Sequence, residues 1–181
     1  MPIGPDDKDW TWVLERPCPE CTFDVSDLPR AHVAPLVRSC AQKWTAVLNA
    51  PPPRLKARPG DDRWSPLEYA CHVRDVFRLY DERLALMLDE DDPTFANWDQ
   101  DETALEHHYR DQDAHAVAAQ LRAAALALAN RFDGVHGDQW DRPGRRSDGA
   151  SFTIETFGRY MIHDPIHHLY DVGAGLPERP S

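Results

Sequence analysis

The sequence predicts an all-α fold, a four-helix bundle with long connecting loops. Four segments carry apolar residues at intervals of three and four, no segment reads convincingly as a strand, and the segments are separated by polar connections. The chain has 181 residues, of which 41% are hydrophobic and 28% are charged. This size and composition are typical of one folded domain rather than of a disordered or fibrous chain.

The first expected helix covers residues 31–49. Its apolar residues fall on one face, and Pro35 is tolerated because the amides of the first turn have no acceptor within the helix. The prolines at 51–53 then end the helix.

The second expected helix has the clearest start. Ser65 supplies an N-cap hydroxyl, Pro66 occupies the first helical position, and Glu68 completes a capping box. An apolar stripe follows for about six turns. The acidic run at 89–92, before Pro93, ends the helix.

Two further helices are expected at about 113–132 and 151–172. Alanines in the third allow close packing between helices. The fourth is expected to use Ser151 as its cap, to be kinked at Pro165, and to stop at Gly173, which suits a left-handed C′ position.

The connectors at 91–111 and 133–150 are too long for tight turns, so at least one is expected to cross over the bundle. The chain is therefore expected to divide into an N-terminal extension that packs on or flanks the bundle, the bundle itself, and a short tail. These parts correspond to residues 1–30, 31–175 and 176–181.

Charge and hydropathy argue against two classes of partner. Lysine and arginine number 20 against 31 aspartates and glutamates, a net charge of −11, so the clustered positive charge that nucleic-acid binding requires is missing. No apolar run is long enough for a membrane helix, and the acidic N-terminus lacks the order of a signal peptide. We therefore expect a cytoplasmic protein that acts on a small molecule.

Three histidines are candidate metal ligands. His163 and His167 are four residues apart, so their rings lie on one face of the fourth helix, and His72 on the second helix is expected to face them across the core. Three imidazoles would leave a coordination position open, as in catalytic zinc sites. The alternative is that these are ordinary core histidines held by hydrogen bonds. His168 is expected to lie outside the ligand set and to pair with Asp164.

Two strings of the sequence resemble a known family. Residues 63–73 (RWSPLEYACHV) and 163–169 (HDPIHHL) are similar to the two signature regions of the DinB/YfiT-like superfamily, and the resemblance extends over about residues 30–175. It implies a four-helix bundle, often dimeric, in which His72, His163 and His167 bind a divalent metal, zinc or nickel.

The resemblance also implies a class of reaction. Characterised members include thiol S-transferases and a mycothiol-dependent maleylpyruvate isomerase, and the arginine-rich composition suits a GC-rich bacterium of the kind that makes mycothiol. We therefore expect metal-dependent activation of a low-molecular-weight thiol toward an electrophile. A metal-dependent hydrolase and a non-catalytic metal- or ligand-binding bundle are the alternatives.

Cys18 and Cys21 form a Cys-x-x-Cys motif that the family does not require. Such a motif can be half a zinc site, a redox pair or a local structural element. No second Cys-x-x-Cys motif is present to complete a zinc site, and a local structural role is favoured. Cys40 and Cys71 fall on expected helices and are assigned to the core.

Several other residues are candidates for substrate binding or for orienting the ligands. Arg159 and Tyr160 precede His163 by about one turn and are placed to reach a bound substrate, and Asp75 is placed to orient an imidazole. The aromatic and cationic residues of the connectors either hold an acidic or sugar-bearing thiol or simply anchor the loops. They are Trp98, Trp140, Arg142, Arg145 and Arg146.

Overall fold

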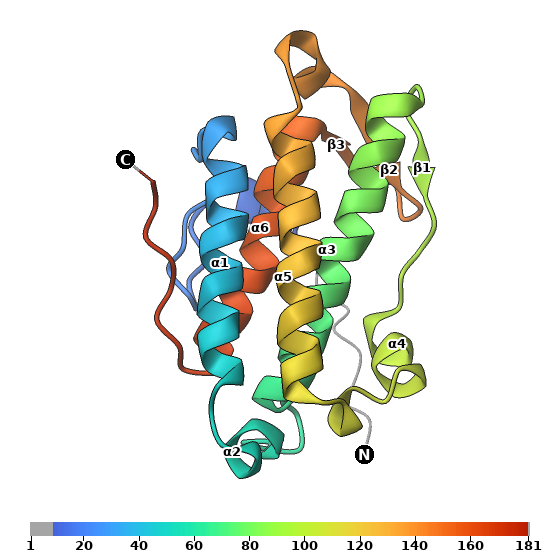
Figure 1. Ribbon diagram of the computed structural model, residues 1–181. Coiled ribbons are helices and arrows are strands. Elements are labelled where there is room, and N and C mark those ends of the chain that lie inside the picture. Colours follow the sequence, from blue (N-terminus) through green and yellow to red (C-terminus); the bar gives the residue numbers. More distant parts are fainter. Residues whose placement is uncertain (1–8, 181) are drawn as a thin grey trace.

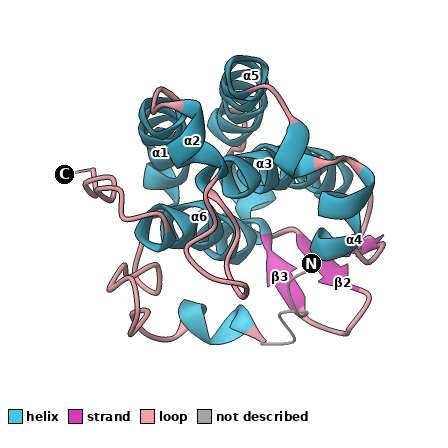
Figure 2. Ribbon diagram, turned by 90° about the horizontal axis from the view of Figure 1, so that it is seen from below, coloured by secondary structure: helices cyan, strands magenta, loops and turns pink. Residues whose placement is uncertain are grey.

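The computed structural model describes residues 9–180 and confirms the four-helix bundle (Figure 1). Viewed from one end, α5 lies against α1 and α3, and α6 packs against the same two helices from the opposite side (Figure 2). The four long helices are α1 (Val33–Leu48), α3 (Pro66–Asp89), α5 (Ala114–Asp133) and α6 (Ile154–Asp171).

The direction of the helices explains the long connectors. In Figure 1, α1 and α6 run downward whereas α3 and α5 run upward. Because α3 and α5 are neighbours and parallel, the chain between them must return along the whole bundle. This crossover contains β1 (Thr94–Phe95), α4 (Gln100–Glu106) and a 3₁₀ turn, η3 (Tyr109–Asp111), and it confirms the expected crossover.

A small sheet corrects the expectation that the chain has no strands. β1 pairs in parallel with β2 (Pro143–Arg146), which pairs in antiparallel with β3 (Ser151–Thr153). Strands of two to four residues are too short to show an alternating pattern in the sequence. The sheet also moves the start of the fourth helix, because Ser151 belongs to β3 and the hydroxyl of Thr153 caps α6 by accepting from the amide of Thr156.

Helix ends follow the sequence signals closely. At α3, the Ser65 hydroxyl accepts from the Glu68 amide and the Glu68 carboxylate accepts from the Ser65 amide, which confirms the capping box. Gly173 has φ +69°, the left-handed conformation expected after α6. The shorter helical elements are η1 (Trp10–Leu14), η2 (Arg30–His32), α2 (Pro52–Lys56) and η4 (Gly137–Asp141).

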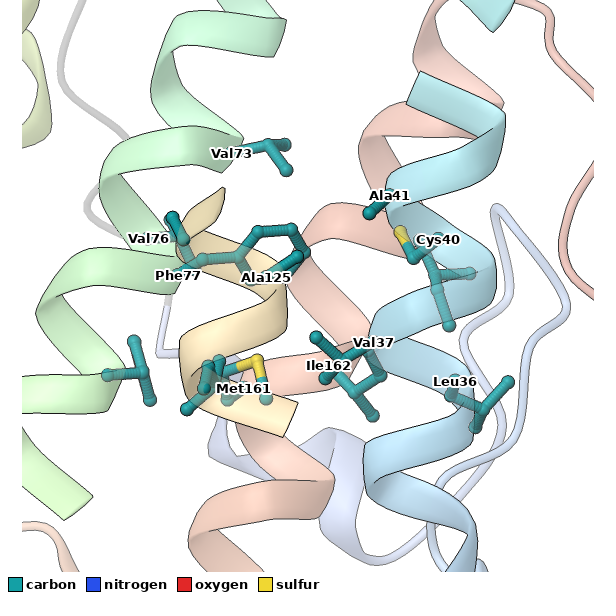
Figure 3. Close-up of a cluster of buried hydrophobic side chains, with 14 of the residues drawn as sticks. Leu36, Val37, Cys40, Ala41, Val73, Val76, Phe77, Ala125, Met161 and Ile162 are labelled. Carbon is teal, nitrogen blue, oxygen red and sulfur yellow. The ribbon is translucent and has the colours of Figure 1, made fainter. Parts of the chain in front are cut away.

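The core fills the space between the four long helices. Figure 3 shows side chains from each helix meeting there, among them Val37, Phe77, Ala125 and Ile162. α6 continues through Pro165, whose carbonyl accepts a 3.0 Å hydrogen bond from the indole of the fully buried Trp44.

The chain before α1 adds to the same core. Val13, Phe23, Val25 and Leu28 are buried against the bundle, although residues 15–29 form neither helix nor strand. Within residues 9–180, no helix is both long and apolar enough to cross a membrane.

Candidate functional site: two clusters of metal-ligand side chains on α6

Helix α6 presents two pairs of side chains that can bind a metal. His163 and His167 form one pair, and Asp164 and His168 form the other. Each pair has a spacing of four residues and so lies on one face, but the two faces differ by one residue, or about 100° around the helix. Neighbouring residues of α6 therefore face different parts of the molecule.

The first cluster joins α6 to the N-terminal segment. Its donor atoms, from Cys18, Cys21, His163 and His167, all lie within 4.8 Å of one another, and all four residues are buried. Cys18 Sγ is 3.6 Å from His167 Nδ1, and Cys21 Sγ is 3.6 Å from His163 Nε2. Burial lowers the pKa of His163 to about 4, so its imidazole is neutral at physiological pH, the form in which histidine binds metals.

The second cluster joins α6 to α3. Donor atoms of His72, Asp164 and His168 lie within 4.8 Å of one another. His72 Nε2 is 3.2 Å from Asp164 Oδ1, and His168 Nε2 is 3.7 Å from Asp164 Oδ2. Burial acts to raise the pKa of Asp164, but His72 and His168 outweigh it and hold this pKa well below its usual range. The carboxylate is therefore ionised and available as a ligand.

The structure divides the ligand set expected from the family resemblance. His163 and His167 lie together as expected, but among residues 9–180 they are grouped with the two cysteines and not with His72. His72 faces the other side of α6, where Asp164 and His168 lie. The expected pairing of Asp164 with His168 is present, but both residues belong to the second cluster of candidate ligands rather than lying outside the ligand set.

Other side chains orient the rings of the second cluster. Nδ1 of His168 lies 2.8 Å from the carboxylate of Asp171, which directs Nε2 toward Asp164. The indole of Trp98, from the crossover, stacks on the His72 ring with centroids 5.4 Å apart and planes 15° apart. A carboxylate behind a histidine is a typical support of a metal ligand.

Asp164 and His168 of the second cluster line a cavity of about 520 Å³, and His163 and His167 of the first cluster line it too. This volume is in the range of sites for small molecules. His72 is fully buried and is not part of the cavity wall. Arg146 and Tyr160 also line the cavity, and Arg146 donates a 2.7 Å hydrogen bond to the Tyr160 hydroxyl. Asp9 and Trp10 complete the wall from the N-terminal side.

Only some of the connector residues reach this cavity. Trp98 and Arg146 line it, as one of the two sequence interpretations expected. The others anchor loops: Trp140 is buried and stacks on Phe132, Arg142 donates to the carbonyl of Met87 at the end of α3, and Arg145 pairs with Asp92.

Two predicted roles are corrected. Arg159 donates to the carbonyls of Leu28 and Ser26, so it fastens the N-terminal segment instead of reaching into the cavity. Asp75 accepts hydrogen bonds from Arg74 and from the Tyr109 hydroxyl, and the imidazole that it contacts, at 3.7 Å, is that of exposed His107 in the crossover. Its contacts therefore hold the crossover on α3 rather than a histidine of either cluster.

The two remaining cysteines lie in the core, as expected. Cys71 is fully buried, and burial raises the pKa of its thiol to about 12, as suits a core residue. Cys40 is also fully buried. The histidines of the crossover and of the first turn of α5 are exposed; they are His107, His108 and His115.

The sequence analysis identified both halves of the first cluster but did not predict that they meet. Cys18-x-x-Cys21 and His163-x-x-x-His167 each have the spacing of half a zinc site, but 142 residues separate Cys21 from His163. Zinc-finger motifs place such halves close together in sequence, so only the folded chain could show that these two halves meet.

Comparison with known proteins agrees with the fold. The sequence model of the DinB superfamily matches residues 36–172. The sequence has no significant match among curated proteins. A solved structure of YfiT from Bacillus subtilis, described as a probable metal-dependent hydrolase with an unusual four-helix bundle topology, has a TM-score of 0.71 at 17% identity, with 78% of this chain and 82% of that chain covered.

A second solved structure, a mycothiol-dependent maleylpyruvate isomerase, is similar over a smaller part of its own length. Its TM-score is 0.66 at 11% identity, with 84% of this chain and 64% of that chain covered, and a point mutant of the isomerase gives 0.68 at 12%. At these identities the likeness establishes the fold.

Proposed function

The chain belongs to the DinB superfamily, and from this premise we propose that it is a metal-dependent enzyme acting on a small molecule, with His72, Asp164 and His168 as its metal ligands. The observation that carries the proposal is the convergence of these three donors, from two helices, beside a 520 Å³ cavity that Asp164 and His168 line. Two imidazoles and one carboxylate are a ligand set of catalytic zinc sites, which keep a position open.

The donor set fits a divalent cation on two grounds. Asp164 is ionised and lies between two imidazoles, and the contact of His168 Nδ1 with Asp171 turns Nε2 toward Asp164. A divalent cation bound there would lower the pKa of a thiol or of water and so supply a nucleophile at neutral pH.

We further propose that the nucleophile is a low-molecular-weight thiol of the mycothiol type. The thiol releases its proton to water, and the sulfur of the thiolate attacks an electrophilic carbon. A carbon–sulfur bond forms as the bond from that carbon to its leaving group breaks, and the leaving group departs with the electron pair, as chloride does from monochlorobimane. Burial raises the pKa of Tyr160, so its hydroxyl stays protonated and, with Arg146, can bind polar groups of the substrate. Trp98 keeps the His72 ring in place and excludes water from one side of it.

The test measures conjugation of mycothiol to monochlorobimane by the zinc-loaded protein, together with metal content by mass spectrometry. We expect His72→Ala and His168→Ala each to lower the rate by at least about 100-fold. This is the upper end of the effect of mutating a residue that only orients a metal ligand, and loss of the ligand itself should cost at least as much. His115→Ala, which removes an exposed histidine of α5, is the control and should leave the rate unchanged.

Three results would count against this proposal. A rate that is unchanged in His72→Ala would remove the second cluster from the reaction. Ester hydrolysis that needs no thiol would favour the hydrolase instead. If His72→Ala and His168→Ala leave the metal content unchanged, the second cluster does not bind a catalytic ion, and a non-catalytic bundle is favoured.

A further inference from the structure

We propose that the first cluster is a second, structural metal site, in which Cys18, Cys21, His163 and His167 bind one zinc ion and fasten the N-terminal segment to α6. Two thiols and two imidazoles are the closed ligand set of structural zinc sites, which leaves no position for a substrate. The chain would therefore carry two metal sites with different tasks.

The distances agree with tetrahedral zinc. Zinc binds cysteine sulfur at about 2.3 Å and histidine nitrogen at about 2.0–2.1 Å, which separates the two ligand atoms by about 3.5–3.6 Å in a tetrahedron. Two of the four sulfur–nitrogen pairs in the cluster, Cys18 with His167 and Cys21 with His163, are 3.6 Å apart. The remaining pairs of ligand atoms lie within 4.8 Å, so a small contraction would close the tetrahedron.

The local backbone brings both thiols to the same side. The amide of Thr22 donates to the carbonyl of Cys18 at 2.8 Å, and the amide of Cys18 donates to the carbonyl of Phe23. This closed loop requires Thr22 to take φ +63°, a conformation that costs energy for a β-branched residue. The strain is consistent with a loop held in place by a strong interaction.

The surroundings of the cluster support its histidine ligands. His167 uses Nδ1 toward Cys18, and its Nε2 faces Glu20 at 3.8 Å and Asp171 at 3.9 Å. Carboxylates behind the free nitrogen are typical partners of metal-bound histidine. The ring of Trp10 packs on His163 and His167, with centroids 5.8 and 5.2 Å away.

A zinc ion here would shape the neighbouring cavity. The N-terminal segment passes beside α6 (Figures 1 and 2), and between η1 and η2 it has no helix or strand to hold it. Asp9 and Trp10, at the start of this segment, line the cavity, and so do two of the proposed ligands, His163 and His167. Because four protein ligands leave no open position on it, the ion would fix this wall of the cavity without taking part in the reaction.

The experiment uses the full chain loaded with zinc and, separately, with cobalt(II). We expect about two zinc ions per chain, falling to about one in Cys18→Ser and in Cys21→Ser and also to about one in His72→Ala. With cobalt, wild type and His72→Ala should show thiolate-to-metal charge transfer, whereas the two serine variants should lack it. Cys40→Ala removes a cysteine buried elsewhere in the core and should behave as wild type.

A second pair of variants tests the site if the serine variants fail to fold. His163→Cys replaces one zinc ligand by another and should keep the ion, whereas His163→Ala should lose it. The proposal is overturned if the serine variants keep the full metal content, if cobalt shows no thiolate band in wild type, or if mass spectrometry of the freshly purified chain finds Cys18 and Cys21 joined as a disulfide. Loss of conjugating activity in His72→Ala alone would bear on the second cluster and not on this one.

Discussion

The contacts of Asp75 predict a strong coupling between α3 and the crossover. Its carboxylate accepts from the Tyr109 hydroxyl at 2.6 Å and from the guanidinium of Arg74 at 2.9 Å, and the three residues are buried. Arg74 also donates to Gln112 of the crossover at 2.6 Å. Because Trp98 lies on the same crossover, these contacts help to hold the indole against the second cluster.

The perturbation is Tyr109→Phe, alone and combined with Asp75→Asn. A hydrogen bond to a charged group contributes about 1.5–3 kcal/mol, and phenylalanine keeps the shape of the ring, so Tyr109→Phe should lower the free energy of unfolding by about 2 kcal/mol. Asp75→Asn leaves Arg74 buried at 3% exposure without its anion, and should cost about 3–5 kcal/mol.

The assay is urea denaturation of zinc-loaded protein at pH 7, followed by circular dichroism. In the Asp75→Asn background, Tyr109→Phe should cost much less than in wild type, a coupling of about 1 kcal/mol or more. Tyr170→Phe, at a tyrosine that is 46% exposed, should change stability by less than about 0.5 kcal/mol. Additive effects would refute the coupling, and loss of zinc without loss of stability would restore the imidazole-orienting role that the sequence suggests for Asp75.

Two further predictions concern stability. Hydrogen bonds from its arginine and tyrosine partners outweigh burial and lower the pKa of Asp75, so its contribution is complete above the unfolded pKa of about 3.9 and is lost as pH falls through the lower folded value. The stability difference between wild type and Asp75→Asn in urea should therefore narrow below about pH 4, and a constant difference would contradict this. Gly144→Ala would place a Cβ 2.8 Å from side-chain atoms of both Met87 and Phe95, so it should cost about 1–3 kcal/mol in thermal denaturation, whereas Gly175→Ala has room and should be nearly neutral. Equal effects of the two substitutions would argue against tight packing at the sheet.

The sequence by itself determined the four helices and most of their ends. The cap at Ser65 and the left-handed conformation of Gly173 depend only on residues close by in the sequence. An apolar stripe on a helix must be buried in any fold that the chain adopts. The long connector also predicted a crossover, since parallel neighbouring helices cannot be joined by a short turn. The three-stranded sheet escaped prediction because its strands are too short to carry a period.

Only the tertiary structure decided how the ligands are shared. The spacing in the sequence predicted that His163 and His167 lie on one face of α6. Which residues each face of α6 meets depends on how the helix is rotated in the bundle. That rotation turns Asp164 and His168 toward His72 and leaves the adjacent histidines to the two N-terminal cysteines. A one-residue offset is about 100° on a helix, and no local signal shows which face a distant segment will cover.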